Sequence, residues 1–448
     1  MSATSATFLQ GSIFKHVAVM TLTGALGLMT LFVVDLADLY FLSSLNTTNI
    51  TAAIGFAGAL AFANLSLSIG TGIASAALVA RNLGAGQVQR AKEFSTGGMV
   101  VSLTFSAVYT LLIDLLIGPI LNLMGAVGET AWQAKIFIWT VSPGFIFLGG
   151  ALACSFSLRG LGDAKRAMYI TLSSAAITLI LDPIFIFGFG WGIVGAGAAN
   201  AISYALCFCV GLYSLRGIHK FYAPFSIMTM KRDFPAIWSI AFPTVLAQLA
   251  TPFAAAYMNY VMAPYGDNIV AAGTVVNRVV PVAFGVVFAL SGAVGPIIGQ
   301  NFGAKNYHRV KRALRDGLVF AIIYSVVMAI LLFLFRDKII AAFHVTGRAA
   351  ELVNFFATWI SMSWALVGGL FVANAAFNNL GKPVYSTWAN WGRATLGTIP
   401  FAIAGAAWGG PEGIMVGTAI GSAIFGLGAM IIAYRLVDRI SGGPTSAV

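Results

Sequence analysis

Long apolar stretches follow one another along almost the whole chain, and short segments with basic residues, glycine, proline or asparagine separate them. A helix that crosses the hydrocarbon core of a bilayer needs roughly 20 mostly apolar residues. Twelve stretches meet this requirement, with approximate centres at residues 28, 66, 109, 144, 177, 204, 247, 284, 325, 363, 395 and 424. The pattern therefore predicts an all-α polytopic membrane protein with twelve transmembrane helices.

The composition agrees with this pattern. The 448 residues are 59% hydrophobic and 9% charged, and the mean hydropathy of +0.90 lies far above that of ordinary soluble domains. The first apolar stretch carries acids and is too long for a cleaved signal, so it is interpreted as a retained helix. The three cysteines show no spacing typical of disulfides or metal sites and are interpreted as packing residues.

The chain carries 25 Lys and Arg residues against 14 Asp and Glu, which gives a formal net charge of +11. The basic residues are spread over many short loops, a distribution that disfavours binding to nucleic acid. Only four basic residues lie in loops opposite the termini, and these are Lys135, Arg336, Lys338 and Arg348. Two more, Arg278 and Arg393, lie within predicted spans. The positive-inside rule then predicts that both termini are cytoplasmic.

An internal repeat with an offset of 219 residues covers most of each half of the chain. The run RNLGAGQVQRAK, which begins at Arg81, lies opposite QNFGAKNYHRVK, which begins at Gln300. Shorter matches at the same offset pair Ala52 and Ala53 with Ala271 and Ala272, and Leu161 and Gly162 with Leu380 and Gly381. Each half holds six spans, so the copies share one orientation. We therefore expect two pseudo-symmetric six-helix lobes, residues 1–220 and 221–448, around a central cleft.

The repeated loop motif has a structural explanation. Gly84 and Gly303 are expected to end helices with positive φ, and the basic residues that follow are expected to stay at the inner surface. No sequence of the type GxxxxGK[ST] occurs, so the motif gives no indication of nucleotide binding.

Four carboxylates, Asp35, Asp38, Asp114 and Asp182, fall inside predicted spans of the first half. An ionisable group at bilayer depth is costly and usually serves transport, coupling or a specific pairing. The structural alternatives to a functional role are that Asp35 and Asp38 contact interfacial water and that Asp182 contacts the backbone. Asp114 lies toward the end of its span, where a structural and a functional role are equally compatible with the sequence.

Spacing places these groups on shared helix faces. Asp35 and Asp38 are three residues apart, and Thr178 and Asp182 are four residues apart, so each pair lies on one face. Two carboxylates that meet away from water repel one another, which favours a bound proton near neutral pH. Thr178, Asn200 and the same carboxylates are also oxygen donors for a hard cation such as sodium. The sequence leaves protons and sodium open as the bound ion.

Several motifs together resemble a known family. They are an aspartate in the first span followed by Ala52-Ala53-Ile54-Gly55, the duplicated Asn-x-Gly-Ala loop, the run LDPIFIFG from Leu181 to Gly188, and VAAG with Arg278. The chain resembles the multidrug and toxic compound extrusion (MATE) transporters, within the larger MOP flippase superfamily, and in particular their DinF-like branch. The resemblance implies two six-helix lobes and export of cationic amphiphilic compounds driven by protons or sodium.

The resemblance also assigns residues. The acid of the first helix aligns best with Asp38, with Asp35 as the close alternative, and the acid of the fifth helix is Asp182. Thr178 stands where the family often has asparagine, and Asn200 offers an amide nearby. The proline bend of helix 1 found in many relatives is missing, because the repeat mate of Pro243 is Gly24.

The leading hypothesis is a secondary multidrug antiporter in the bacterial inner membrane, a monomer that is no enzyme and needs no cofactor beyond H⁺ or Na⁺. Organic cations are the expected partners, and candidates to line the cleft are Tyr257, Gln248, Asn259, Asn374 and Arg278. Hydrogen bonding between helices explains these polar residues equally well. The alternative is a lipid-linked oligosaccharide flippase, which would need several arginines toward the cleft. Only Arg278 and Arg393 lie within spans, and structural pairing or gating is the favoured role for both.

Overall fold

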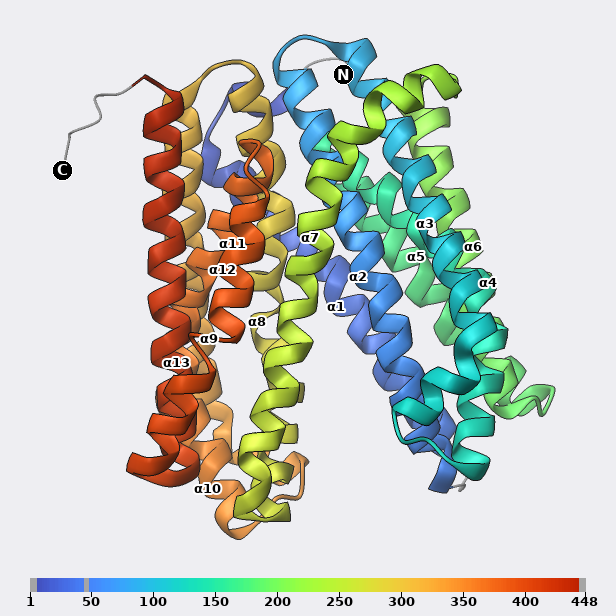
Figure 1. The fold of residues 1–448 in the computed structure, drawn as a ribbon, viewed down its shortest axis with the longest axis vertical. Coiled ribbons are helices and arrows are strands. Elements are labelled where there is room, and N and C mark those ends of the chain that lie inside the picture. The colour runs from blue at the N-terminus through green and yellow to red at the C-terminus, as the bar shows by residue number, and fades with distance from the viewer. Residues whose placement is uncertain (1–5, 44–47, 443–448) are drawn as a thin grey trace. The chain divides into compact units, whose positions relative to one another are not determined.

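The computed structural model describes residues 6–43 and 48–442, and helices make up almost all of them (Figure 1). Within these ranges it leaves out the side chains at positions 31, 32, 35, 36, 39, 43, 48, 49, 51 and 267. The all-α prediction is therefore confirmed.

The first half of the chain forms six long helices. They are α1 (Ile13–Ser43), α2 (Thr48–Gly84), α3 (Val88–Leu123), α4 (Gly128–Leu161), α5 (Ala164–Pro183) and α6 (Gly192–Leu212). A 3₁₀ turn, η1 (Thr7–Leu9), precedes α1. Short π-helical segments, η2 (Ile184–Gly188) and η3 (Tyr213–Ile218), extend α5 and α6.

The second half repeats this plan with more interruptions. Its helices are α7 (Ile227–Met262), α8 (Asp267–Gly303), α9 (Tyr307–Ala342), α10 (Gly347–Phe355), α11 (Trp364–Asn379), α12 (Val384–Ala394) and α13 (Ile399–Ile440). A 3₁₀ turn, η4 (Ala263–Tyr265), lies between α7 and α8. Two short segments, η5 (Phe356–Ile360) and η6 (Ser361–Ser363), join α10 to α11.

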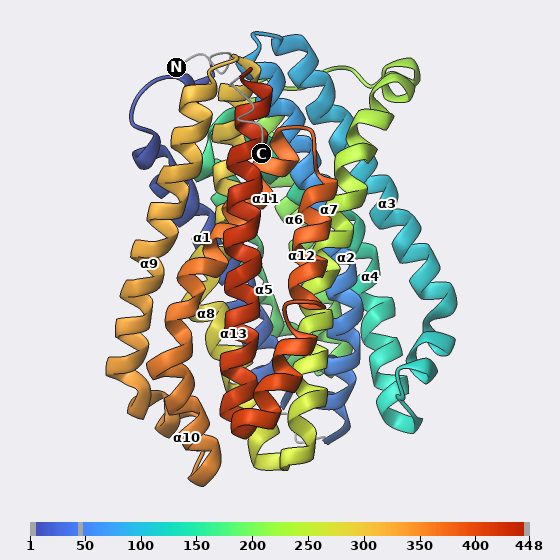
Figure 2. The same ribbon diagram turned by 60° about the vertical axis from the view of Figure 1, so that its left-hand side comes forward.

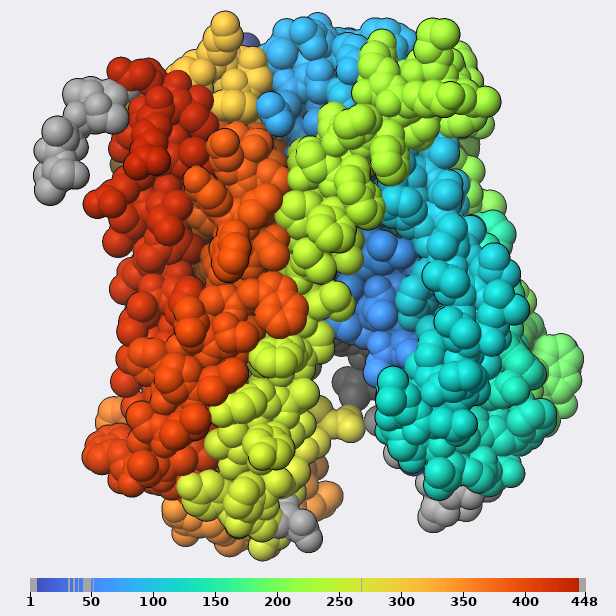
Figure 3. All heavy atoms as spheres, in the orientation of Figure 1, coloured from blue at the N-terminus to red at the C-terminus, as the bar shows by residue number. Residues whose placement is uncertain are grey.

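Eleven stretches of the described residues are long and apolar enough to cross a membrane. The last of them, Val384–Ile440, contains two arms, because Gly409 and Gly410 have non-helical backbone. The arms approach so closely that a Cβ at Gly405 would lie 2.0 Å from the Gly413 carbonyl oxygen. The views place α12 and α13 side by side (Figures 2 and 3). With this hairpin the described chain accommodates the twelve predicted crossings.

The chain divides into two compact units. Unit 1 contains the described residues from Leu26 to Val245, and unit 2 contains Ala6–Ala25 and the described residues from Leu246 onward. The helices α1 and α7 are thus each shared between the units, and the two division points lie within one residue of the offset of the repeat. The boundary expected at residue 220 lay in the polar stretch before α7, whereas this division falls inside α7.

The duplicated loops have matching backbone geometry, but the expected position of the positive φ was wrong. Helices α2 and α8 do end at Gly84 and Gly303, yet the positive φ falls two residues later, at Gly86 (75°) and Lys305 (57°). In each loop the amide of that later residue donates to the carbonyl three positions earlier, at 3.0 Å and 2.9 Å. The helix therefore closes its last turn before the backbone adopts the left-handed conformation.

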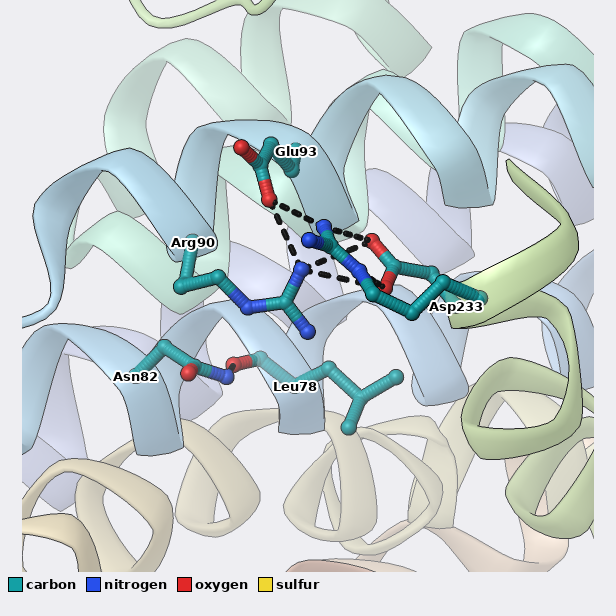
Figure 4. Close-up of polar contacts among 6 residues, drawn as sticks. Leu78, Asn82, Arg90, Glu93 and Asp233 are labelled. Atoms are coloured by element: carbon teal, nitrogen blue, oxygen red, sulfur yellow. Dashed lines mark hydrogen bonds and ion pairs between the residues drawn. The ribbon is translucent and has the colours of Figure 1, made fainter. Parts of the chain in front are cut away.

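An arginine of the first loop motif fixes the beginning of α7 within unit 1. Arg90 of α3 donates to Asp233 at 3.0 Å and to Glu93 at 2.7 Å, and Figure 4 shows its guanidinium between the two carboxylates. Arg232 binds the same two carboxylates, and the Asp233 side chain is only 1% exposed. The network therefore attaches the start of α7 to α3.

The repeat-related arginine of the second loop plays an equivalent part within unit 2. Arg309 of α9 donates to the carbonyl oxygens of Phe8 and Gly11, at 2.9 Å and 3.1 Å. Asn301 donates to the Phe8 carbonyl as well, at 3.2 Å, and Phe8 is buried. Each loop motif thus holds the segment that leads into a helix shared between the units.

Candidate functional site

Two helices of unit 1 bring two carboxyl groups together. Asp38 lies on α1 and Asp182 lies one residue before Pro183, at the end of α5. Their carboxyl groups lie close enough for the charge of one to act on the other, although the residues are far apart in the sequence. Asp38 is 9% exposed and Asp182 is fully buried. Proline and the π-helical segment η2 end the regular helix next to Asp182.

A third helix contributes an amide to this pair. Asn200 of α6 is buried, and its Nδ2 donates to Asp38 Oδ2 at 2.8 Å and to the Ala196 carbonyl at 3.1 Å. Thr178 lies one turn before Asp182 and is buried, and its hydroxyl has no hydrogen-bond partner among the described residues. The structure therefore brings Asp38, Asp182 and Asn200 together and places Thr178 on the same face of α5.

The pair lacks compensating positive charge. Among the described residues, neither Asp38 nor Asp182 forms an ion pair with a basic side chain, and both Asp182 oxygens lack a hydrogen-bond partner. An uncompensated carboxylate away from water is strongly disfavoured. The site can lower this cost by holding a proton or by coordinating a hard cation through its oxygens.

The other two candidate acids stand apart from this arrangement. Asp35 lies within α1, but its side chain is outside the part of the chain that the structure describes. Asp114 of α3 accepts a hydrogen bond from the Ser142 hydroxyl of α4 at 3.0 Å. That contact joins two neighbouring helices, so the geometry of Asp114 supports its structural interpretation.

The five candidates for the substrate lie in unit 2. Gln248, Tyr257 and Asn259 occupy the part of α7 that belongs to this unit, Arg278 is exposed on α8, and Asn374 is buried on α11. No hydrogen bond or ring contact among the described residues joins two of the five. The structure thus places them on three helices without assembling them into one cluster.

One polar cluster that sequence reasoning missed lies at the beginning of α5. Asp163 caps this helix by accepting from the Arg166 amide at 3.0 Å, and its other oxygen contacts the Arg166 and His219 side chains. Burial alone would raise the pKa of Asp163, but the hydrogen bonds from Arg166 and His219 outweigh burial and lower it below the ordinary value. The acid directly after Gly162 is a typical N-cap signal and could have revealed the cluster.

Among the described residues, no group of three or more His, Cys, Asp or Glu side chains could hold a metal ion. The oxygens near Asp182 are instead suited to a proton or an alkali cation.

Comparison with known proteins agrees with the repeated helical architecture and defines a class of membrane transporter. The family model described as MatE matches residues 25–184 and 243–403. The chain belongs to the MatE family, whose members are transporters and not enzymes.

Individual relatives match almost the full length. The chain is 28% identical over 430 residues to an FAD transporter of Shewanella oneidensis, covering 94% of each protein. It is 25% identical to the multidrug export protein MepA of Staphylococcus haemolyticus, covering 98% of each. The Vibrio cholerae MATE transporter VcmN in the bent form shares the fold, with a TM-score of 0.90 at 23% identity, over 96% of this chain and 98% of VcmN.

Proposed function

We propose that this protein is a secondary antiporter that exports organic compounds in exchange for protons or sodium bound at Asp38 and Asp182. The observation that carries the proposal is the buried pair of carboxyl groups without a basic partner among the described residues. Asn200 orients Asp38, and Thr178 offers a further oxygen to a cation. Asp35 is the alternative carrier on α1.

Coupling needs only that ion and cargo favour different states of the transporter. A proton or Na⁺ at Asp182 removes the cost of uncompensated charge and stabilises the state in which the site is closed to water. Cargo stabilises the opposite state. The ion gradient then drives export without covalent chemistry.

Multidrug efflux is the first candidate for the cargo, because MepA proteins match the full chain. Cationic amphiphiles suit apolar and aromatic surfaces, where cation–π contacts replace water. Unit 2 offers Tyr257, Gln248, Asn259, Asn374 and Arg278 as candidate contacts. We further propose a monomer in the bacterial plasma membrane with both termini cytoplasmic.

The test measures ethidium efflux from vesicles under an imposed pH gradient and then under a sodium gradient. The wild type is expected to respond to one of the gradients, and Asp38→Asn and Asp182→Asn are expected to abolish the response at normal membrane abundance. Asp337→Asn is the matched control, because the Asp337 side chain is 84% exposed. Full efflux by both site variants would refute the coupling site.

A second candidate cargo is an anionic nucleotide, as the name of the Shewanella relative suggests. One observation favours it: Arg393 lies within a span of unit 2 and forms no ion pair among the described residues. Measuring export of FAD beside that of ethidium distinguishes the two cargoes, and failure to transport FAD would remove this candidate.

A further inference from the structure

Arg393 lies deep in a membrane-spanning segment of unit 2. It is the tenth residue of α12, so at about 1.5 Å per residue it stands roughly 14 Å from the start of that helix. Arg393 lies inside the candidate membrane span Val384–Ile440, and half of a hydrocarbon core about 30 Å thick is about 15 Å. A guanidinium at that depth requires a partner or a function.

The described part of the chain supplies no such partner. The Nε of Arg393 is buried and has no hydrogen-bond partner, and no described hydrogen bond or ion pair uses the guanidinium. This contrasts with Arg90, which binds two carboxylates. The structural pairing expected for Arg393 is therefore not seen among the described residues.

One buried amide shares the face of α12 that carries Arg393, and another lies on the neighbouring helix α11. Asn390 is three residues earlier and buried, and Ser386, a further turn back, donates to Asn378 Oδ1 of α11 at 3.0 Å. The chain turns back between α11 and α12, so the two helices run in opposite directions. One turn away from the contact between Ser386 and Asn378, Asn374 on α11 is therefore level with Asn390 on α12. Asn374 is 6% exposed, and its Oδ1 has no hydrogen-bond partner among the described residues.

The helix is broken directly after Arg393. Regular helix stops at Ala394 and resumes at Ile399, and the Thr398 hydroxyl donates to the Arg393 carbonyl at 2.8 Å. Gly421 on the second arm of the hairpin permits a close approach to this break, since a Cβ there would lie 1.7 Å from the Gly397 carbonyl oxygen. Irregular backbone at membrane depth is typical of transporter binding sites.

We propose that Arg393, with Asn374 and Asn390, forms an internal recognition site for the oxyanion of a transported solute, a phosphate or carboxylate with a neighbouring O–H or N–H group. The guanidinium matches the geometry of such an oxyanion and donates to it. The Asn374 oxygen is an acceptor and takes the neighbouring donor of the solute. This proposal rests on the proposed transport function and specifies that the cargo carries a negatively charged oxyanion.

Flavin mononucleotide (FMN) and riboflavin form a matched pair of probes, because they share the ring and differ by one phosphate. Binding to the protein in nanodiscs of zwitterionic lipid is followed by flavin fluorescence anisotropy without any ion gradient. We expect FMN to bind about tenfold more tightly than riboflavin, and Arg393→Gln to remove this preference. Arg439→Gln is the control, since Arg439 is exposed and outside the site.

Three results would overturn the site. They are equal or undetectable binding of both flavins to the wild type, an Arg393→Gln variant that keeps the preference, and an Arg439→Gln variant that loses it equally. The phosphate of a lipid headgroup is the other possible ligand, and adding anionic lipid to the nanodiscs tests it. If binding of the lipid depends on Arg393 and binding of FMN does not, the site serves a headgroup and the proposal is wrong. Ethidium efflux of the Asp182→Asn variant reports on coupling separately, so failure of either proposal is visible on its own.

Discussion

The helix α5 of unit 1 and the helix α12 of unit 2 are related by the repeat but carry opposite charges beyond their first turns. In α5 the charge is the buried carboxyl of Asp182, whose repeat mate is Phe401. In α12 the charge is the guanidinium of Arg393, whose repeat mate is Ser174. Neither charge is balanced by an opposite charge among the described residues. One duplicated framework therefore supports two different recognition chemistries, which we assign to the coupling ion and to the cargo.

The largest effect on transport is expected from removing the buried carboxyl group of Asp182. Asp182→Asn keeps the size of the side chain but can neither release a proton nor attract a cation, so gradient-driven ethidium efflux should fall about tenfold or more. Initial efflux rates normalised to membrane abundance measure the loss. Normal efflux rates under both gradients would show that Asp182 of unit 1 does not bind the coupling ion.

Removing the guanidinium of Arg393 should stabilise the folded protein, whereas most mutations destabilise it. Arg393→Met replaces a half-buried guanidinium, whose buried Nε has no hydrogen-bond partner among the described residues, by an apolar chain, and we expect about 1–3 kcal/mol of added stability in the absence of cargo. Thermal unfolding of the purified protein in nanodiscs measures this change. A lower unfolding temperature would mean that Arg393 makes a stabilising contact in the folded protein.

The two anchors of the shared helices provide a further comparison between the units. Asp233 is almost fully buried between two arginines, so Asp233→Asn should destabilise unit 1 by about 1–3 kcal/mol. Arg309→Gln removes hydrogen bonds to exposed and part-buried carbonyl groups and should cost less, about 1 kcal/mol. Thermal unfolding with limited proteolysis compares them, and a larger cost for Arg309→Gln would reverse the predicted order.

The smallest expected effect concerns the cap of α5 and depends on pH. The pKa of Asp163 is lowered in the folded protein, so its charge contributes stability above the ordinary pKa of about 3.9 and loses that contribution as pH falls through the lower folded value. Asp163→Asn keeps the capping oxygen, and at pH 7 it should cost below about 1 kcal/mol. The difference from wild type should begin to shrink as pH falls below about 4 and vanish only below the lowered folded pKa, and a difference that grows there would contradict the assignment.

Much of the architecture was predictable because it follows from composition and periodicity. Apolar length determines the spans, and the repeat predicts matching loops. The spacing of Thr178 and Asp182 correctly placed both on one face of α5, which the structure joins to Asp38 and Asn200.

Other features depend on long-range geometry that one sequence does not contain. The division of α1 and α7 between the units is set by packing, and the position of the positive φ at Gly86 is set by how the last helical turn closes. Whether an arginine within a span is paired depends on its neighbours in space. The sequence favours pairing or gating for Arg393, and only the structure shows that its guanidinium has no partner among the described residues, in contrast to the bridged Arg90.

The most direct test of the central claim is infrared difference spectroscopy of the purified protein in sodium-free buffer near neutral pH. The account predicts a stretching band of a protonated buried carboxyl group that disappears when the pH is raised or sodium is added. The band should be missing in Asp182→Asn and present in Asp337→Asn. A wild-type spectrum without this band, or a band that neither ion changes, would contradict the claim that Asp38 and Asp182 hold the coupling ion.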